Sequence, residues 1–132
     1  NLISDLTGDF IIDALDYALE IPRAAPLTYS LGFNIDGNLG TWRSITRISY
    51  YHRDKSYYNE NNQGFINEQD ILNFGYDIYS SDGKINIGIY GKNLSNEVKH
   101  GGDTNLSFGG TFAPLAKGKI VGAELVYKFW SK

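Results

Sequence analysis

A strict alternation of apolar and polar side chains is the feature that most constrains the fold of this chain. Residues 27–35 alternate without an exception, and residues 85–89 and 118–129 repeat the pattern. Ile85, Ile87 and Ile89 alternate with polar or small residues along the first of these segments, as Val121, Ala123, Leu125 and Tyr127 do along the second. Successive side chains of a strand point to opposite faces of the sheet, so each segment predicts a strand with one apolar and one polar face.

The lengths of the connections add a second constraint. Five strands are expected, near residues 27–35, 41–53, 71–79, 85–90 and 118–129, and the turns at 36–40 and 80–84 are short. The connections at 54–70 and 95–117 are long. In an antiparallel up-and-down meander, all short turns then lie at one rim and all long loops at the other. Outer-membrane barrels have this asymmetry, so the pattern predicts an all-β meander that forms part of a transmembrane β-barrel.

Arginines indicate which face of the strands is polar. Arg43 and Arg47 lie on one face of residues 41–53, opposite Trp42, Ile48 and Tyr50. An arginine facing lipid at the bilayer midplane costs about 2–4 kcal/mol, so the arginine face is expected to face the barrel lumen. We predict that Arg43 or Arg47 pairs with Asp77 of a neighbouring strand. The residues expected to face the lumen are Arg43, Arg47, Asn73, Asp77 and Glu124.

Composition excludes several classes of protein. A net charge of -3 and a pI of about 5.2 argue against a nucleic-acid partner. The chain has no Cys, which excludes disulfides and thiolate metal sites, and no run of about eighteen apolar residues that predicts a membrane-spanning helix. It has no Met and begins with Asn1, from which we expect a processed chain or a fragment.

Residues 1–26 are expected to form a loop region on the long-loop, extracellular side, followed by strands in 27–130 and a tail at 131–132. Within this region, residues 9–20 fit either one short helix with Asp9 as its N-cap or an extended loop. Pro22 and Pro26 end any such helix before the first strand.

Several motifs occur in the order in which one family has them. The most distinctive is Gly91-Lys92-Asn93-Leu94-Ser95-Asn96-Glu97, and Tyr127-Lys128-Phe129 ends the last strand. Residues 21–29, 50–55, 71–73 and 112–114 supply the other matches. Over about residues 21–129 the chain resembles the C-terminal end of TonB-dependent outer-membrane receptors. The resemblance implies that these are the last five of about twenty-two barrel strands.

The resemblance also implies a location and partners. The location is the bacterial outer membrane, and the role is energised uptake of a scarce nutrient of the siderophore, cobalamin or glycan class. The implied partners are the first barrel strand and the plug domain of the same receptor, outer-membrane lipid, the TonB system acting through the plug, and the small-molecule or glycan substrate. The chain departs from the family pattern in lacking a plug domain. Either Phe129 or Trp130 could serve as the terminal aromatic that barrel assembly reads.

Neither an enzyme nor a cofactor site is expected. Ser, Asp and His residues occur without a pattern that brings them together, and His52 and His100 are interpreted as solvated loop histidines without a ligand pair. In the first long loop, Tyr57, Tyr58, Asn59 and Asn61 suit the capture of a sugar or siderophore, although such residues also suit a solvated loop. The aromatics expected in the interfacial girdles are Trp42, Tyr50, Tyr76, Tyr127 and Phe129.

A soluble β-sheet module that binds a ligand or carbohydrate is the alternative. The two hypotheses differ in what covers the apolar face. A barrel wall leaves one continuous apolar band, whereas a soluble sandwich covers that face with a second sheet. The residues that test this are Leu31, Phe33, Ile48, Phe74, Ile87 and Leu125.

Overall fold

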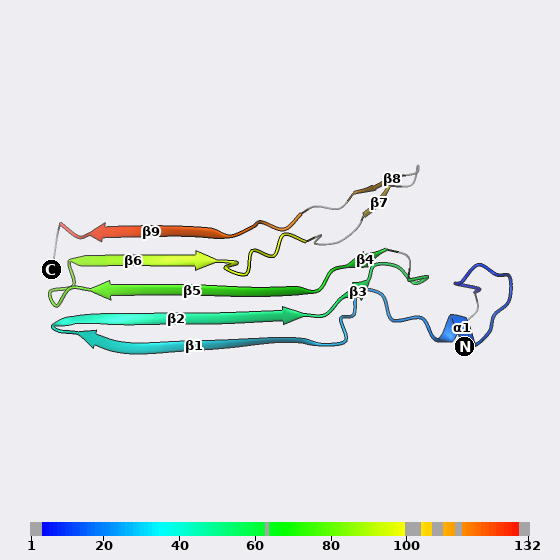
Figure 1. Cartoon of the computed structure of the whole chain (residues 1–132), viewed down its shortest axis with the longest axis horizontal. Coiled ribbons are helices and arrows are strands. Elements are labelled where there is room, and N and C mark those ends of the chain that lie inside the picture. The colour runs from blue at the N-terminus through cyan, green and yellow to red at the C-terminus, as the bar shows by residue number, and fades with distance from the viewer. Residues whose placement is uncertain (1–3, 63, 100–103, 107–109, 113–114, 130–132) are drawn as a thin grey trace. The chain divides into compact units, whose positions relative to one another are not determined.

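The structure is a computed structural model that describes residues 4–62, 64–99, 104–106, 110–112 and 115–129. It is all-β, with one five-stranded antiparallel sheet and a single short helix among these residues (Figure 1). The chain divides into two compact units. The loop unit comprises residues 1–28, 53–69 and 99–116, and the sheet unit comprises residues 29–52, 70–98 and 117–132.

The main sheet has the strand order β1-β2-β5-β6-β9, so its long strands are neighbours in the order of the sequence. Their bounds are Thr28–Leu39 for β1, Trp42–Arg53 for β2, Gln69–Tyr79 for β5, Ile85–Lys92 for β6 and Ile120–Tyr127 for β9. The prediction of five meandering antiparallel strands is therefore confirmed.

The two short turns lie at the same end of the sheet (Figure 1). The turn at 80–84 forms as predicted: Gly83 has a φ of 69°, and its N–H donates to the Ser80 carbonyl at 2.9 Å. The first turn was predicted at 36–40, which is wrong by several residues. β1 continues through Leu39, and Gly40, with a φ of 64°, makes the turn into Trp42. Asp36 lies within the extended strand, and its carboxylate pairs with Arg43 of β2.

The register aligns apolar side chains in rows across the sheet. Ile87 of β6 lies between Ile78 of β5 and Leu125 of β9, and Ile89 lies between Tyr76 and Ala123. The opposite parity carries a polar row, in which Gly88 lies between Asp77 and Glu124. Cross-strand neighbours of one parity share a face, so the predicted apolar and polar faces are present. We call them the apolar face and the polar face.

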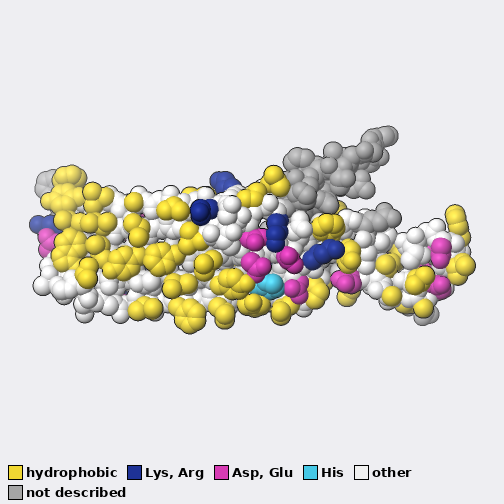
Figure 2. Space-filling model, viewed as in Figure 1, with side chains coloured by type: hydrophobic (Ala, Val, Ile, Leu, Met, Phe, Trp, Pro, Cys, Tyr) yellow, Lys and Arg dark blue, Asp and Glu magenta, His cyan; other side chains and the backbone are white. Residues whose placement is uncertain are grey.

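The apolar face is exposed. Leu31, Phe33 and Leu125 expose 54%, 61% and 71% of their surface, and Ile48 and Ile87 are also classed as exposed. Phe74 is half-buried. Among the described residues, Ile66 is the one buried hydrophobic side chain, and it belongs to the loop unit. Figure 2 shows the hydrophobic side chains spread over the strands on one face of the molecule.

The loop unit contains short strands where only polar loops were expected. β3 (Ser56–Tyr57) pairs with β4 (Phe65–Ile66), and β7 (Thr104–Leu106) pairs with β8 (Gly110–Phe112). Side chains such as Tyr57 and Phe65 favour extended backbone, which explains the first of these ladders. No helix among the described residues is both long enough and apolar enough to cross a membrane.

The helix α1 is one turn, Ala14–Tyr17, and its N-cap is Asp13. The predicted N-cap, Asp9, is wrong. Asp13 and Asp16 satisfy each other's backbone N–H groups in a capping box, and Asp9 instead accepts from the Ile11 N–H at 2.9 Å. The buried Asp16 carboxylate also accepts from the N–H groups of Leu6 and Thr7, both at 2.9 Å. The Asp16 side chain therefore links residues 6 and 7 to α1.

This arrangement predicts an acid-sensitive N-terminal segment. The N–H groups of Thr7 and Asp13 lower the pKa of Asp16. A carboxylate with a lowered folded-state pKa contributes stability that is fully present above its unfolded pKa of about 3.9 and is lost as the pH falls through the folded value. We expect the amide signals of Thr7 and Asp13 to shift together in an NMR titration from about pH 6 to pH 2. Asp16→Asn should abolish this transition and Asp9→Asn should preserve it; an unchanged transition in Asp16→Asn would refute the role of Asp16.

Candidate functional site

The polar face carries an ion pair at its centre. Arg47 of β2 pairs with Asp77 of β5, and the Asp77 side chain is only 14% exposed. This confirms the predicted pairing for Arg47. Arg43 pairs with Asp36 of β1 instead, because both lie close to the turn that joins β1 to β2. A partly buried carboxylate needs a charged or hydrogen-bonding partner, which Arg47 supplies.

Glycines give the long polar side chains room to lie flat on this face. A Cβ on Gly88 would lie 2.6 Å from Oδ1 of Asp77, and a Cβ on Gly122 would lie 2.5 Å from the Tyr90 ring. At Gly75 the approach is looser, since a Cβ there would lie in ordinary contact with the Arg47 side chain, 3.6 Å from its Nε. Glycine in a strand interior commonly marks such a close approach. The side chains of Arg47, Asp77 and Tyr90 are thereby held against the sheet.

A shallow depression of about 610 Å³ lies among these residues. Its polar lining comes from Asn34, Arg47, Ser49, Asn73, Tyr90 and Lys92. Asn73 is fixed there by two contacts: its Nδ2 donates to the Ser49 hydroxyl at 3.2 Å, and its Oδ1 accepts from the Asn93 N–H at 3.0 Å. Donors and acceptors on a rigid sheet can bind the polar surface of a partner. Of the predicted lumen residues, Arg47 and Asn73 line this depression, Asp77 pairs with Arg47, and Glu124 lies in the row beyond Gly88.

Gly88 provides a test of this packing. We expect Gly88→Ala to destabilise the folded chain by about 1–2 kcal/mol, because the added methyl overpacks against Asp77, which Arg47 holds in place. Urea unfolding of the folded chain measures the change. Gly32→Ala is the matched control, since its Cβ would meet only the Ile48 carbonyl, at 3.9 Å. In an Asp77→Ala background the cost of Gly88→Ala should vanish; an equal cost in both backgrounds would contradict the overpacking.

The motif Gly91-Lys92-Asn93-Leu94 acts as a structural turn. Asn93 is buried, and its Nδ2 donates to the carbonyls of Glu97 at 3.0 Å and Lys117 at 2.8 Å. Its Oδ1 accepts from the Glu97 N–H at 2.9 Å. Asn93 has a φ of 50°, in the left-handed region that Asn tolerates better than most residues. One side chain thus ties the end of β6 to the segment that leads into β9.

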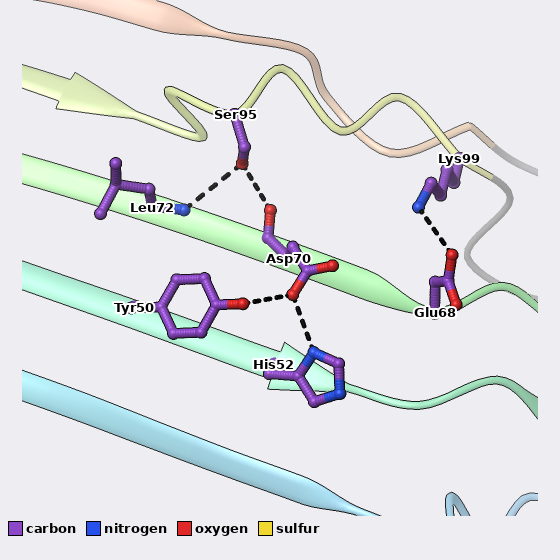
Figure 3. A network of polar contacts seen from close by, with 7 residues as sticks. All are labelled: Tyr50, His52, Glu68, Asp70, Leu72, Ser95 and Lys99. Atoms are coloured by element: carbon purple, nitrogen blue, oxygen red, sulfur yellow. Dashed lines mark hydrogen bonds and ion pairs between the residues drawn. The ribbon is translucent and has the colours of Figure 1, made fainter.

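Other residues of the motif reinforce this turn. Leu94 folds over Gly91, where a Cβ would lie 2.5 Å from Cδ2 of Leu94. The Ser95 hydroxyl donates to the Asp70 carbonyl and accepts from the Leu72 N–H at 3.4 Å (Figure 3). Asn96 accepts from the Lys119 N–H at 3.0 Å. The motif therefore anchors the ends of β5, β6 and β9. Of its first four residues, Gly91 and Lys92 also line the polar depression.

A cluster at the apolar face corrects the interpretation of His52. His52 is the second-last residue of β2, and its side chain is only 18% exposed, so it is not a solvated loop histidine. Nδ1 of His52 lies 2.8 Å from Oδ1 of Asp70, which also accepts from the Tyr50 hydroxyl (Figure 3). The Tyr29 ring packs 4.9 Å from the imidazole ring. Asp70 was missed, although its parity with Leu72 places it on the face of Tyr50.

The predicted loop residues separate into two groups. Tyr57 packs beneath Lys55, whose Nζ lies 5.0 Å from the ring centroid of Tyr57 and 4.4 Å from that of Phe65. Tyr58, Asn59 and Asn61 line a second depression. In the same loop unit, Lys99 pairs with Glu68 at 3.5 Å (Figure 3).

At the end of the sheet, Tyr127 and Phe129 pack edge to face, with their centroids 4.9 Å apart. Phe129 exposes 82% of its surface, and Lys128 donates its N–H to the Lys84 carbonyl at 2.9 Å. His100 and Trp130 lie outside the described residues. Within the described ranges, no three His, Asp or Glu side chains are grouped as ligands of one metal ion.

Comparison of the chain with models of protein families, with curated proteins and with solved structures gave no match. The function must therefore be argued from the residues and the geometry above.

Proposed function

We propose that this chain forms part of the barrel wall of a TonB-dependent receptor in the bacterial outer membrane. In this role it is a structural component of a transporter for a scarce nutrient of the siderophore, cobalamin or glycan class. Its partners are the plug domain, the first barrel strand, outer-membrane lipid and, through the plug, the TonB system.

The observation that carries the proposal is the exposed apolar face. Five neighbouring strands present a continuous series of apolar side chains, among them Leu31, Phe33, Ile87 and Leu125, which the described residues leave exposed. Soluble monomers rarely expose a contiguous apolar patch larger than a few hundred Å². In a bilayer the same face lies against hydrocarbon and needs no protein cover.

The opposite face supports the same assignment. It carries the Arg47–Asp77 pair and the polar depression, which suit a water-filled or plugged lumen. The short turns at one end of the sheet, with long connections leaving the other, also fit the periplasmic and extracellular rims of such a barrel. The motif residues that suggested the family hold the extracellular ends of β5, β6 and β9 together in this arrangement.

Cell fractionation tests the proposal. The complete gene product, extracted from the outer-membrane fraction in mild detergent, should migrate faster on a gel before boiling than after it, because closed barrels resist unfolding by the gel detergent at room temperature. Quantitative recovery in the soluble fraction would overturn the proposal and favour the soluble ligand-binding module.

A further inference from the structure

The loop unit holds a depression of about 620 Å³ between three of its segments. Hydrogen bonds hold two of these segments together. The Glu20 N–H donates to Oδ1 of Asn62 at 2.8 Å, and Nδ2 of Asn62 donates back to the Glu20 carbonyl at 3.0 Å. The Arg23 N–H donates to the Tyr57 carbonyl at 2.6 Å. The depression therefore has a preformed wall and a volume in the range of about 300–1,000 Å³ that small-molecule sites occupy.

Arg23 is the central side chain of this wall. Its guanidinium carbon lies 4.6 Å from the centroid of the Tyr58 ring, and both residues line the depression. Stacking on the ring fixes the orientation of the guanidinium. Its N–H groups lie in the guanidinium plane and point away from the ring, where they can donate to a ligand. Arg23 also has a φ of 58°, which is uncommon for a residue with a long side chain and often marks a functional position.

Asn59 adds an acceptor to the same wall. Its Oδ1 is shielded from solvent and has no hydrogen-bond partner among the described residues. Its backbone is fixed, because the Asn59 carbonyl accepts from the Asn62 N–H at 3.1 Å. A buried acceptor without a partner is rare in native structures. Because Oδ1 is covered in the free protein, the Asn59 side chain must rotate toward the depression before a ligand hydroxyl can donate to it.

The charges of the lining argue for a neutral ligand. Arg23 is accompanied by two carboxylates, Asp5 and Glu60. Asp5 is engaged by its own turn, where Oδ1 accepts from the Gly8 N–H and Oδ2 from the Phe10 N–H, both at 2.7 Å. The exposed Glu60 carboxylate repels an anion approaching Arg23. The carboxamide, guanidinium and phenol groups of the lining together offer hydrogen-bond donors and acceptors. The hydroxyl groups of a neutral ligand can pair with both kinds.

We infer that this depression binds a neutral oligosaccharide. Sugar hydroxyls donate to Asn59 and accept from Arg23, and the apolar face of a sugar ring packs against Leu6 and Pro22, which also line the depression. The inference rests on the proposed function and deepens it, because it selects the glycan class among the substrates named there and assigns it to this depression of the loop unit.

Titration calorimetry of the full chain in mild detergent tests the inference, with maltotetraose, cellotetraose, xylotetraose and mannotetraose as neutral probes and trigalacturonate as an acidic one. We expect at least one neutral probe to bind. Tyr58→Ala, Asn59→Ala and Arg23→Gly should each weaken that binding roughly tenfold or more, since each leaves polar groups of the bound sugar unpaired. Glycine at position 23 retains the left-handed backbone, so this variant removes the side chain alone.

Tyr17→Ala is the matched control, because Tyr17 is an exposed tyrosine of the same unit outside the depression. It should leave the affinity unchanged. Binding of no neutral probe, binding of trigalacturonate alone, or equal affinity in Tyr58→Ala and the unsubstituted chain would each overturn the inference. The fractionation experiment tests the membrane location separately from sugar binding. A failure of the sugar-binding inference can therefore be told from a failure of the proposed function.

Discussion

We expect Leu125→Arg to destabilise the folded protein in lipid vesicles by about 2–3 kcal/mol, and Glu124→Arg to change its stability by less than about 1 kcal/mol. The two residues are neighbours on β9, and both are exposed. They differ in face: Leu125 lies beside Ile87 on the apolar face, and Glu124 lies beside Gly88 on the polar face. If lipid covers the apolar face, the arginine at position 125 must leave water, and the arginine at position 124 does not.

Urea titration of folding into vesicles measures both variants against the unsubstituted protein. Leu125 is 71% exposed, so its replacement loses little packing within the protein. The difference between the two variants therefore reports on the surroundings of the apolar face. In a soluble sheet both substitutions would be tolerated about equally. Equal and small effects of the two variants would therefore contradict a lipid-facing surface.

Asn93→Ala is expected to cost about 3–5 kcal/mol of unfolding free energy. The substitution removes the bonds to the Lys117 carbonyl and to both backbone polar groups of Glu97, and each of these three partly buried hydrogen bonds contributes about 1 kcal/mol. Alanine also adopts the left-handed φ of 50° at a further cost of about 1–2 kcal/mol.

Two further variants separate these contributions in the same urea titration. Asn93→Gly removes the side chain but tolerates the backbone, so it should cost about 1 kcal/mol less than Asn93→Ala. Asn96→Gly loses a single bond, to the Lys119 N–H, and should cost about 1 kcal/mol in total. If Asn93→Ala proved no more harmful than Asn96→Gly, the turn would not depend on Asn93 as described.

The sheet could be predicted from the sequence because period-two alternation depends on local geometry alone. The face of Arg47 and its pairing with Asp77 followed from the cost of burying unpaired charge. The end of β1 was misplaced because Asp36 and Gly37 have strong turn propensity, while pairing with β2 extends the strand through Leu39. Tertiary pairing overrode local propensity at that position.

The parts that escaped prediction depend on contacts between distant segments. His52 and Asp70 are 18 residues apart, and only the β2–β5 neighbourhood brings the two side chains together. Arg23 joins the loop depression through a backbone bond to Tyr57, and nothing in residues 21–26 indicates that contact. The role of Asn93 likewise depends on Lys117, which is 24 residues away.

The strand order also restricts how the sheet can be completed. Five antiparallel neighbours place β1 and β9 at the two edges, and these strands run in the same direction (Figure 1). Direct pairing of β9 with β1 of the same chain would therefore form a parallel ladder, whose bonding pattern differs from that of every other pair. A ring of purely antiparallel strands that includes this sheet must add an odd number of strands between the two edges. The parity of the strand count thus limits the closed rings to which this sheet can belong.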